Sequence, residues 1–265
     1  MNETIAILGA VSEEIAGIKR KINISDRVRL DKSEAWFGKW HGKNIVLVRT
    51  GVGRKRAKNA THQVIDKFNP GVIISMGYAG ALTEGLNVGD LFVASTILSP
   101  ESDSMSFDMG DPKNLKWLEL TKKTPTPENV KLKVGRLITV DMVVHTPEAK
   151  KELGNRFRAE AVEMETLEIA LLTRLNKIPF ISIRGISDAV NHELIDSSSF
   201  LGNDGEISKL RAGWYVLTHP KSIKNAFSLR YNTQIATQNL TDFISRLVSI
   251  LLPSFGRIHR YKKHS

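Results

Sequence analysis

Four acidic side chains stand at positions where the sequence changes from an apolar run to a turn. Glu14 and Asp188 each follow a short apolar run, and Glu163 and Glu165 stand just before another. A carboxyl group can donate a proton, accept one or hold a hydroxyl. Cleavage of a glycosidic bond uses these functions for the leaving group, the attacking molecule and the sugar. These carboxylates are therefore the first candidates for a site.

The order of the apolar segments predicts one α/β domain with a mixed or mostly parallel sheet, because short apolar runs alternate with amphipathic ones. Strands are expected at residues 4–8, 35–40, 44–48, 72–76, 91–94, 137–140 and 179–183. Helices are expected at residues 13–21, 54–68 and 210–252. One further helix begins at Pro147, and another ends at about residue 175. A loop is expected at residues 99–114 and a lid at 191–206. Ligands bind beyond the carboxyl ends of strands in such sheets, where the four carboxylates fall.

Composition limits the remaining possibilities. The chain has 265 residues and no cysteine, which excludes disulfides, thiolate zinc sites and a cysteine nucleophile. No segment reaches the length of a membrane span, and the start at Met1 lacks the pattern of a signal peptide. The histidines show no paired spacing of metal ligands, so no metal is expected. We expect a cytoplasmic protein with one domain over residues 1–252.

The formal net charge of +10 has several readings. An anionic membrane surface, a substrate phosphate or solubility alone would each account for it. Part of the excess lies in residues 253–265, a basic C-terminal tail that is either a weak membrane-surface contact or a solvated end. No aromatic-rich basic motif is present, so no nucleic-acid partner is expected.

Five short motifs resemble those of one enzyme family. They are IAILGAVSEE at residues 5–14, TGVG at 50–53, GYAGAL with VGD at 77–90, AVEME at 161–165 and RGISD at 184–188. Each is weak alone, but together and in this order they resemble the methylthioadenosine/S-adenosylhomocysteine nucleosidases of the nucleoside phosphorylase/nucleosidase family. Residues 217–240 are more similar to phosphorylase-type relatives associated with hopanoid biosynthesis.

The resemblance implies a three-layer fold of the phosphorylase/hydrolase type, with a mixed central sheet flanked by helices. It implies cleavage of the N-glycosidic bond of an adenosine-type nucleoside through an oxocarbenium-like transition state, without a cofactor. It also implies a homodimer or larger homo-oligomer, in which Phe107 is the candidate to reach a neighbour's site.

The resemblance also assigns roles to individual residues. Glu14 would activate the attacking water, and Asp188, held by the backbone around Ser187, would be the acid at the purine imidazole nitrogen. Glu165 would accept hydrogen bonds from the ribose hydroxyls. Three further contacts are expected from Glu163 in the sugar-binding motif, Met164 under the sugar, and the backbone of Val144 and His145 beside the base.

Two departures from the nucleosidase pattern leave the attacking molecule open. Tyr78 follows Gly77 where the hydrolases carry a small hydroxyl residue, so its ring would reshape the nucleophile pocket or the place of the substrate tail. Arg54 and Arg56 follow the glycine turn at Gly53 and either form a solvated basic face or hold phosphate. Hydrolysis and phosphorolysis, with inorganic phosphate as co-substrate, both remain open. A large lipid-like 5′ substituent on the substrate also remains open.

Other interpretations of these residues compete with the prediction of an enzyme of this family. Glu14 in a first helical turn could simply complement the helix dipole. The glycines at 51 and 53 superficially suit a dinucleotide-binding turn, but Arg56 occupies the third glycine position. A nucleoside-binding module without activity is the last alternative, and the intact set of Glu14, Glu165 and Asp188 argues against it.

Overall fold

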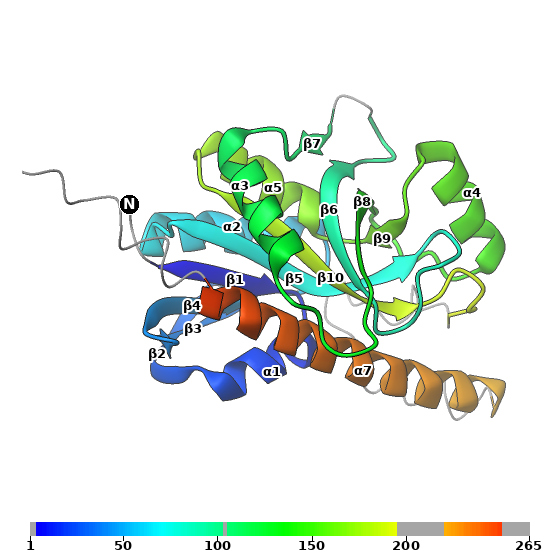
Figure 1. Ribbon diagram of the computed structural model, residues 1–265, viewed down its shortest axis with the longest axis horizontal. Helices are drawn as coiled ribbons and strands as arrows, with labels where there is room; N and C mark the ends of the chain where they lie inside the picture. Colours follow the sequence, from blue (N-terminus) through cyan, green and yellow to red (C-terminus); the bar gives the residue numbers. More distant parts are fainter. Residues whose placement is uncertain (1–3, 103–104, 195–219, 251–265) are drawn as a thin grey trace, which may run out of the picture.

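A ten-stranded mixed sheet forms the centre of the computed structural model, with helices on both of its faces (Figure 1). The structure describes residues 4–102, 105–194 and 220–250, with side chains of the last helix described from residue 230. The strand order is β10-β6-β8-β9-β5-β1-β4-β3-β2, with β7 paired to β6 and β10 paired also to β5. This confirms the three-layer α/β fold expected from the sequence.

The strands are β1 (Ile5–Gly9), β2 (Asn23–Leu30), β3 (Ser33–Trp40), β4 (Lys43–Arg49), β5 (Val72–Ala81), β6 (Leu91–Leu98), β7 (Phe107–Asp108), β8 (Leu132–Thr139), β9 (Ala161–Glu163) and β10 (Phe180–Asp188). The helices are α1 (Ser12–Lys21), α2 (Arg54–Phe68), α3 (Pro112–Lys123), α4 (Pro147–Phe157), α5 (Thr166–Leu175) and α7 (Pro220–Ile250).

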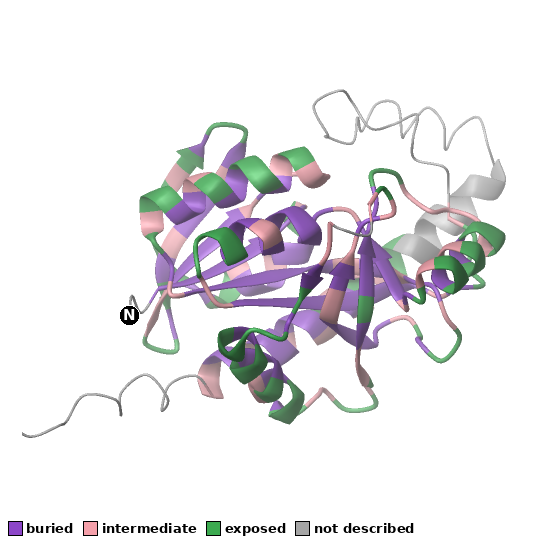
Figure 2. Cartoon of the chain, turned by 90° about the horizontal axis from the view of Figure 1, so that it is seen from above, coloured by how far each residue is buried: buried purple, intermediate pink, exposed green. Residues whose placement is uncertain are grey.

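The central strands β1, β5 and β10 run parallel to one another and bring their carboxyl ends to one edge. Their residues are buried almost throughout, which explains why they read as continuous apolar runs in the sequence (Figure 2). Helices α2, α3 and α5 cover one face of the sheet, and α1 and α7 cover the other (Figure 1).

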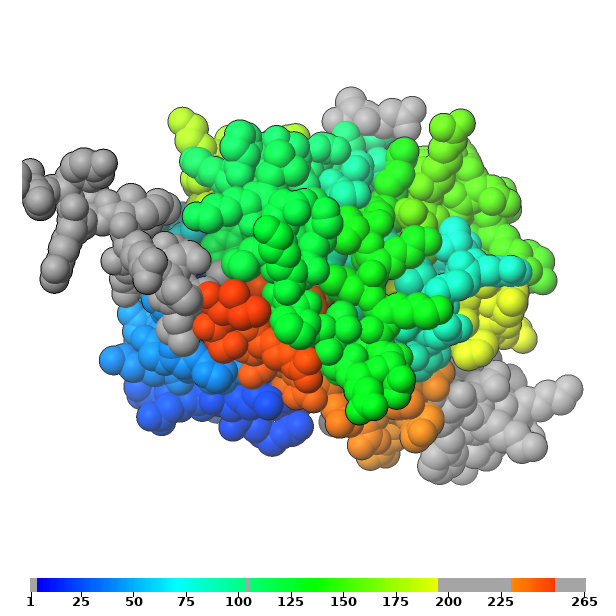
Figure 3. All heavy atoms as spheres, in the orientation of Figure 1, coloured from blue at the N-terminus to red at the C-terminus, as the bar shows by residue number. Residues whose placement is uncertain are grey.

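Helix α7 covers the sheet on the same face as α1. In the space-filling view it lies at the surface between the N-terminal segments and the segment that follows α3 (Figure 3). Arg246 of α7 donates a hydrogen bond to the carbonyl of Thr126 at 2.8 Å, and Asn239 donates one to the carbonyl of Gly89 at 2.9 Å. The C-terminal helix predicted from the sequence is therefore part of the domain.

The structure differs from the sequence expectation at several places. The short strands β7 and β9 are not among the expected strands. The sequence pattern also does not predict the edge strand β2, because its residues are mostly exposed and polar. The predicted loop at 99–114 is too long, because α3 begins at Pro112, where the Asp111 carboxylate accepts a hydrogen bond from the backbone N–H of Lys113. Strands β5 and β10 continue through the motifs at 77–81 and 184–188, whereas the strands expected from the sequence end at residues 76 and 183.

Two predicted features lie outside the described residues, namely most of the lid at 191–206 and the whole basic tail at 253–265. Among the helices that the structure describes, none combines the length and the apolar character needed to cross a bilayer.

Candidate active site

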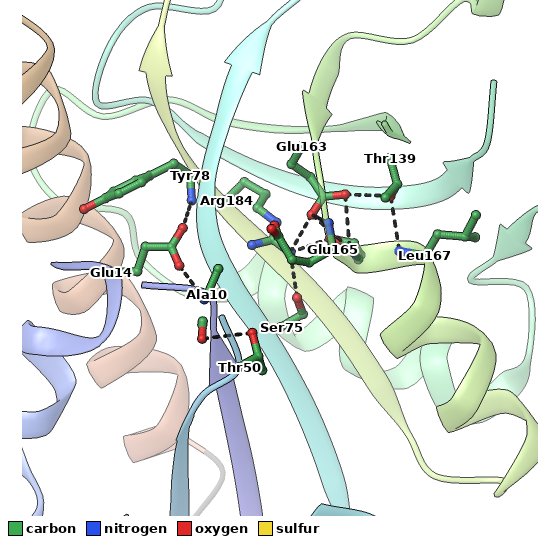
Figure 4. A network of polar contacts seen from close by, with 12 residues as sticks. Ala10, Glu14, Thr50, Ser75, Tyr78, Thr139, Glu163, Glu165, Leu167 and Arg184 are labelled. Carbon is green, nitrogen blue, oxygen red and sulfur yellow. Dashed lines mark hydrogen bonds and ion pairs between the residues drawn. The ribbon is translucent and has the colours of Figure 1, made fainter. Parts of the chain in front are cut away.

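Glu14 lies where β1 ends and α1 begins, with its carboxylate buried beside β5. One carboxylate oxygen accepts hydrogen bonds from the backbone N–H groups of Ala10 at 2.6 Å and Val11 at 3.1 Å. The other accepts one from the backbone N–H of Tyr78 at 2.9 Å (Figure 4). Glu14 thus lies in the first turn of α1, where its charge complements the helix dipole. It also reaches across to β5, which a role in the helix dipole alone does not explain.

Burial raises the pKa of Glu14 above its ordinary value of 4.5. The charge of Arg184 and the three backbone donors act in the opposite direction and offset part of the effect. A carboxylate whose pKa is raised while it stays anchored accepts a proton more readily than a surface glutamate does.

Gly77 of β5 lies against both Glu14 and Arg184. A Cβ atom at this position would lie 2.4 Å from Nη1 of Arg184 and 2.5 Å from Oε1 of Glu14. Neither side chain could then keep its place, so glycine is required here by close approach. This contact brings the end of β1 and the middle of β10 to the same point of the sheet.

Arg184 of β10 is buried and held by three partners. Its Nη2 lies 2.6 Å from the hydroxyl of Ser75 and 3.2 Å from the carboxylate of Glu163, and it also donates to the hydroxyl of Thr166. The sequence placed Arg184 in a motif without giving it a function. In the structure it is the cation that balances the buried carboxylates around it.

Glu163 is turned into the protein rather than toward a ligand. Besides the Arg184 ion pair, its carboxylate accepts hydrogen bonds from the Thr139 hydroxyl at 2.6 Å and from the backbone N–H groups of Glu165 and Thr166 (Figure 4). Both oxygens are therefore occupied within the chain. Glu163 therefore supports the segment that carries Glu165, and its contact with the sugar stays a prediction.

Glu165 is buried and accepts a hydrogen bond from the backbone N–H of Gly53 at 2.7 Å, at the start of α2. Burial, together with the negative charges of Glu163 and Glu14, raises its pKa to about 8. The negative charge of Glu14 acts on Glu165, so the two carboxylates lie within electrostatic reach of each other. The N-terminus of α2 is thus occupied by a side chain of this chain, which also argues against the dinucleotide reading.

Asp188 ends β10 opposite Gly80 of β5. One carboxylate oxygen accepts a hydrogen bond from the Ser187 hydroxyl at 2.7 Å, and the other lies 2.6 Å from Nζ of Lys150. Lys150 was not identified from the sequence because it stands in the charged stretch 148–152, which reads as a solvated helix face. Its side chain is nevertheless fully buried.

A small apolar cluster lies beside two of the predicted substrate contacts. Val144, predicted beside the base, and Met164, predicted under the sugar, both pack against it. The cluster consists of Leu82, Ile138, Val140, Ala159 and Val162. The carbonyl of His145 accepts a hydrogen bond from the backbone N–H of Leu194 at 2.8 Å. The loop after β8 is thereby joined to the segment that follows Asp188.

Comparison with known proteins identifies the family. The family model described as "Phosphorylase superfamily" matches residues 4–209 of the chain. The chain belongs to the phosphorylase superfamily.

Curated relatives of this superfamily member include 5′-methylthioadenosine/S-adenosylhomocysteine nucleosidases. The chain is 32% identical to that of Staphylococcus haemolyticus (strain JCSC1435) over 216 residues, which are 77% of this chain and 95% of the relative. It is also 32% identical to that of Staphylococcus epidermidis over 198 residues, which are 71% of this chain and 87% of the relative.

Solved structures confirm the phosphorylase-superfamily fold. The nucleosidase of Neisseria meningitidis, in complex with methylthio-immucillin-A, matches with a TM-score of 0.73 and 23% identity, over 94% of this chain and 99% of that chain. The futalosine hydrolase of Helicobacter pylori matches with a TM-score of 0.71 and 22% identity, over 94% and 98%.

The Tyr78 ring of this superfamily member extends from β5 toward α7 (Figure 4). Its hydroxyl lies 2.5 Å from that of Thr237 on α7, and burial raises the pKa of the phenol. Tyr78 therefore contributes its backbone N–H to Glu14 and its side chain to the attachment of α7.

Arg54, predicted as a phosphate ligand, is neutralised within the chain. Its guanidinium lies 2.6 Å from the carboxylate of Glu101, 3.2 Å from that of Glu168 and 3.9 Å from that of Asp141. Arg56 lies instead over Gly51 and lines a hollow that is rich in basic residues. The other basic residues of this hollow are Arg27, Arg29, Lys32 and Arg49.

Phe107, the candidate to reach a neighbour's site, is buried within its own subunit. Phe107 lies in β7 with 1% of its surface exposed and packs edge-on against Phe180 with ring centroids 5.5 Å apart. As for metals, the part of the chain that the structure describes contains no cluster of three His, Cys, Asp or Glu side chains suited to hold an ion.

Proposed function

We propose that this chain hydrolyses the N-glycosidic bond of an adenosine-type purine nucleoside. One observation carries the proposal: the Glu14 carboxylate is buried and anchored by three backbone N–H groups, and its pKa is raised in the same network as Glu165. A buried, anchored carboxylate with a raised pKa can act as a general base toward water. The nucleosidase relatives support the same class of reaction.

The residues divide the reaction among them. Glu14 removes a proton from water, which attacks the anomeric carbon as the sugar becomes oxocarbenium-like. The bond between sugar and base breaks, its electron pair goes to the purine, and the purine takes a proton at its imidazole nitrogen from the side of Asp188. Glu165 accepts hydrogen bonds from ribose hydroxyls, and Met164 and Val144 supply apolar contacts.

Hydrolysis is favoured over phosphorolysis by the charges at the site. Bound phosphate beside Glu14 would place two anions in contact at a buried position, which is unfavourable. Arg54, one of the two candidate phosphate ligands, already faces three carboxylates. A phosphorylase remains the second candidate because Arg56 lies at the glycine turn in a basic hollow.

Adenine release from methylthioadenosine and from adenosine, each with and without phosphate, tests the proposal. We expect release without phosphate and no acceleration when phosphate is added. A requirement for phosphate, with a ribose 1-phosphate product, would establish phosphorolysis and move attention to Arg56. No release from either substrate would favour a larger, lipid-like 5′ substituent or a binding module without activity.

We further infer an enzyme that acts in the cytoplasm as a homo-oligomer and uses no cofactor. The absence of cysteine fits a reducing compartment, and the resemblance to the nucleosidases supports the assembly. The basic tail would give at most a weak contact with an anionic membrane surface.

A further inference from the structure

Lys150 is a buried lysine whose three donors are all engaged. Its Nζ lies 2.6 Å from the Asp188 carboxylate, 3.1 Å from the carbonyl of Ala189 and 2.8 Å from the carbonyl of His192. An ammonium group has three N–H donors and no acceptor. The three oxygens therefore match a charged lysine, and the side chain itself has no exposed surface.

The surroundings of Asp188 match the ionised carboxylate. One oxygen faces the ammonium of Lys150, and the other accepts the hydroxyl of Ser187 at 2.7 Å. Gly80 leaves the room for this arrangement, because a Cβ atom there would lie 2.8 Å from the oxygen that faces Lys150. A buried ammonium is tolerable only when it is paired and hydrogen-bonded, and this pair meets both conditions.

This geometry changes how a proton reaches the leaving purine. A solitary buried aspartic acid would carry the proton itself, but Asp188 rests as a carboxylate beside a lysine that holds one. We propose that Lys150 is a positioning residue that acts through Asp188 and supplies the proton with which the purine departs. The inference rests on the proposed glycosidic cleavage.

The proton balance of this step closes. As the bond to the sugar breaks, its electron pair moves to the purine, whose imidazole nitrogen takes a proton through Asp188. The Lys150 ammonium replaces that proton, so Asp188 ends as the carboxylate it was and Lys150 ends as a neutral amine. The proton that Glu14 removes from water returns through solvent to Lys150, which restores the resting pair.

Lysine and arginine differ in the property that matters here. Both carry a positive charge, but a guanidinium does not give up its proton in proteins, whereas a lysine ammonium can. Lys150→Arg therefore keeps the charge beside Asp188 without keeping a transferable proton. Lys150→Met removes both and approximates the length of the side chain. Lys151→Met, at the exposed neighbouring position of α4, is the matched control.

The test is the pH dependence of kcat and KM for adenine release from methylthioadenosine. At about pH 8 we expect both Lys150 variants to lose roughly 10²–10³-fold in kcat, with KM within about threefold of the parent. At about pH 5.5 the loss in Lys150→Met should shrink to roughly tenfold or less, because the more acidic solvent can replace the proton that Lys150 supplies. Lys151→Met should match the parent throughout.

Two results would overturn the inference. Recovery of kcat by Lys150→Arg would show that the charge or the geometry alone is needed. A loss in Lys150→Met that is equal at every pH would show a structural role. If Lys150→Met does not fold, the double variant Lys150→Met/Asp188→Asn, which contains no unpaired charge, is compared with Asp188→Asn; a further loss above about tenfold would contradict action through Asp188.

Failure of the proposed function is separable from failure of this inference. A parent protein that releases no adenine from methylthioadenosine or adenosine at any pH removes the proposed function for these two substrates. An active parent whose Lys150 variants stay active at alkaline pH removes only the role of Lys150.

Discussion

At the scale of single residues, three buried glutamates of one network differ in what surrounds them. Glu163 has both oxygens occupied by Thr139, Arg184 and backbone donors, and Glu14 has both occupied by backbone donors alone. Glu165 accepts a hydrogen bond from the backbone of Gly53. The residue type is the same in all three, so the partners of each carboxylate, and not its residue type, set the role that we propose for it.

Glu14→Gln tests the base. The amide can still accept a backbone hydrogen bond but cannot take a proton, so we expect kcat to fall roughly 10²–10⁴-fold while KM changes little. Steady-state kinetics of adenine release measures both constants. The exposed neighbour Glu13→Gln serves as the control, and an active Glu14→Gln enzyme would exclude Glu14 as the base.

The acidic limb of the parent's pH–rate profile should lie above the ordinary glutamate value of 4.5, because burial raises the pKa of Glu14. The base must be ionised to work, so kcat/KM falls as the pH drops through that raised pKa. A profile that stays flat down to pH 4.5 would contradict the assignment.

Glu165→Gln tests the electrostatic strain at the site. The pKa of Glu165 is 4.5 in the unfolded chain and about 8 in the folded protein. Its protonated form therefore stabilises the fold fully below pH 4.5, and this stabilisation is lost as the pH rises toward about 8. The parent should therefore lose stability over this window, by an amount on the order of 5 kcal/mol at most. Glutamine cannot ionise and can keep the hydrogen bond from Gly53, so the variant should be the more stable protein at alkaline pH. The midpoints of urea unfolding at both ends of this pH range measure the difference between the parent and the variant. An equal change of the midpoint with pH in both proteins would refute the prediction.

At the scale of elements, the site depends on two strands that continue past their apolar runs. β5 extends through Gly77 and Gly80, and β10 extends to Asp188. The glycines keep side chains out of the way of Glu14, Arg184 and Asp188. The pairing of β5 with β10, rather than a flexible turn, therefore fixes how far the site residues on one strand lie from those on the other.

Tyr78→Phe tests the attachment of α7 to β5. It removes the hydrogen bond to Thr237 without changing the ring, so we expect a loss of about 1 kcal/mol in the free energy of unfolding. Tyr231→Phe, on the exposed face of the same helix, is the control and should be neutral. In a double-mutant cycle, Thr237→Ala should add nothing to Tyr78→Phe; additive losses would show that the pair is not coupled.

At the scale of the whole molecule, the proposed assembly is open to direct measurement. Light scattering on the purified protein should give a mass of at least twice the 29.6 kDa of the chain. Because Phe107 is buried in its own subunit, any contribution of a neighbour to the site must come from other residues. A fully active monomer would remove the oligomer from the proposal.

The sequence alone determined the class of fold and the positions of the candidate carboxylates. Apolar runs and the motifs that follow them are local features, since a strand buried on both faces needs a continuous apolar segment wherever it occurs. Glu14, Glu165 and Asp188 could therefore be found at strand ends without coordinates.

The tertiary structure decided which groups each candidate meets. Lys150 stands 38 positions from Asp188, Gly53 stands 112 from Glu165, and Tyr78 stands 159 from Thr237. No local pattern encodes such pairs: Lys150 reads as a solvated charge, and Arg54 as a phosphate ligand. Hydrogen bonding and ionisation depend on the atoms within a few ångströms, and only the folded chain brings those atoms together.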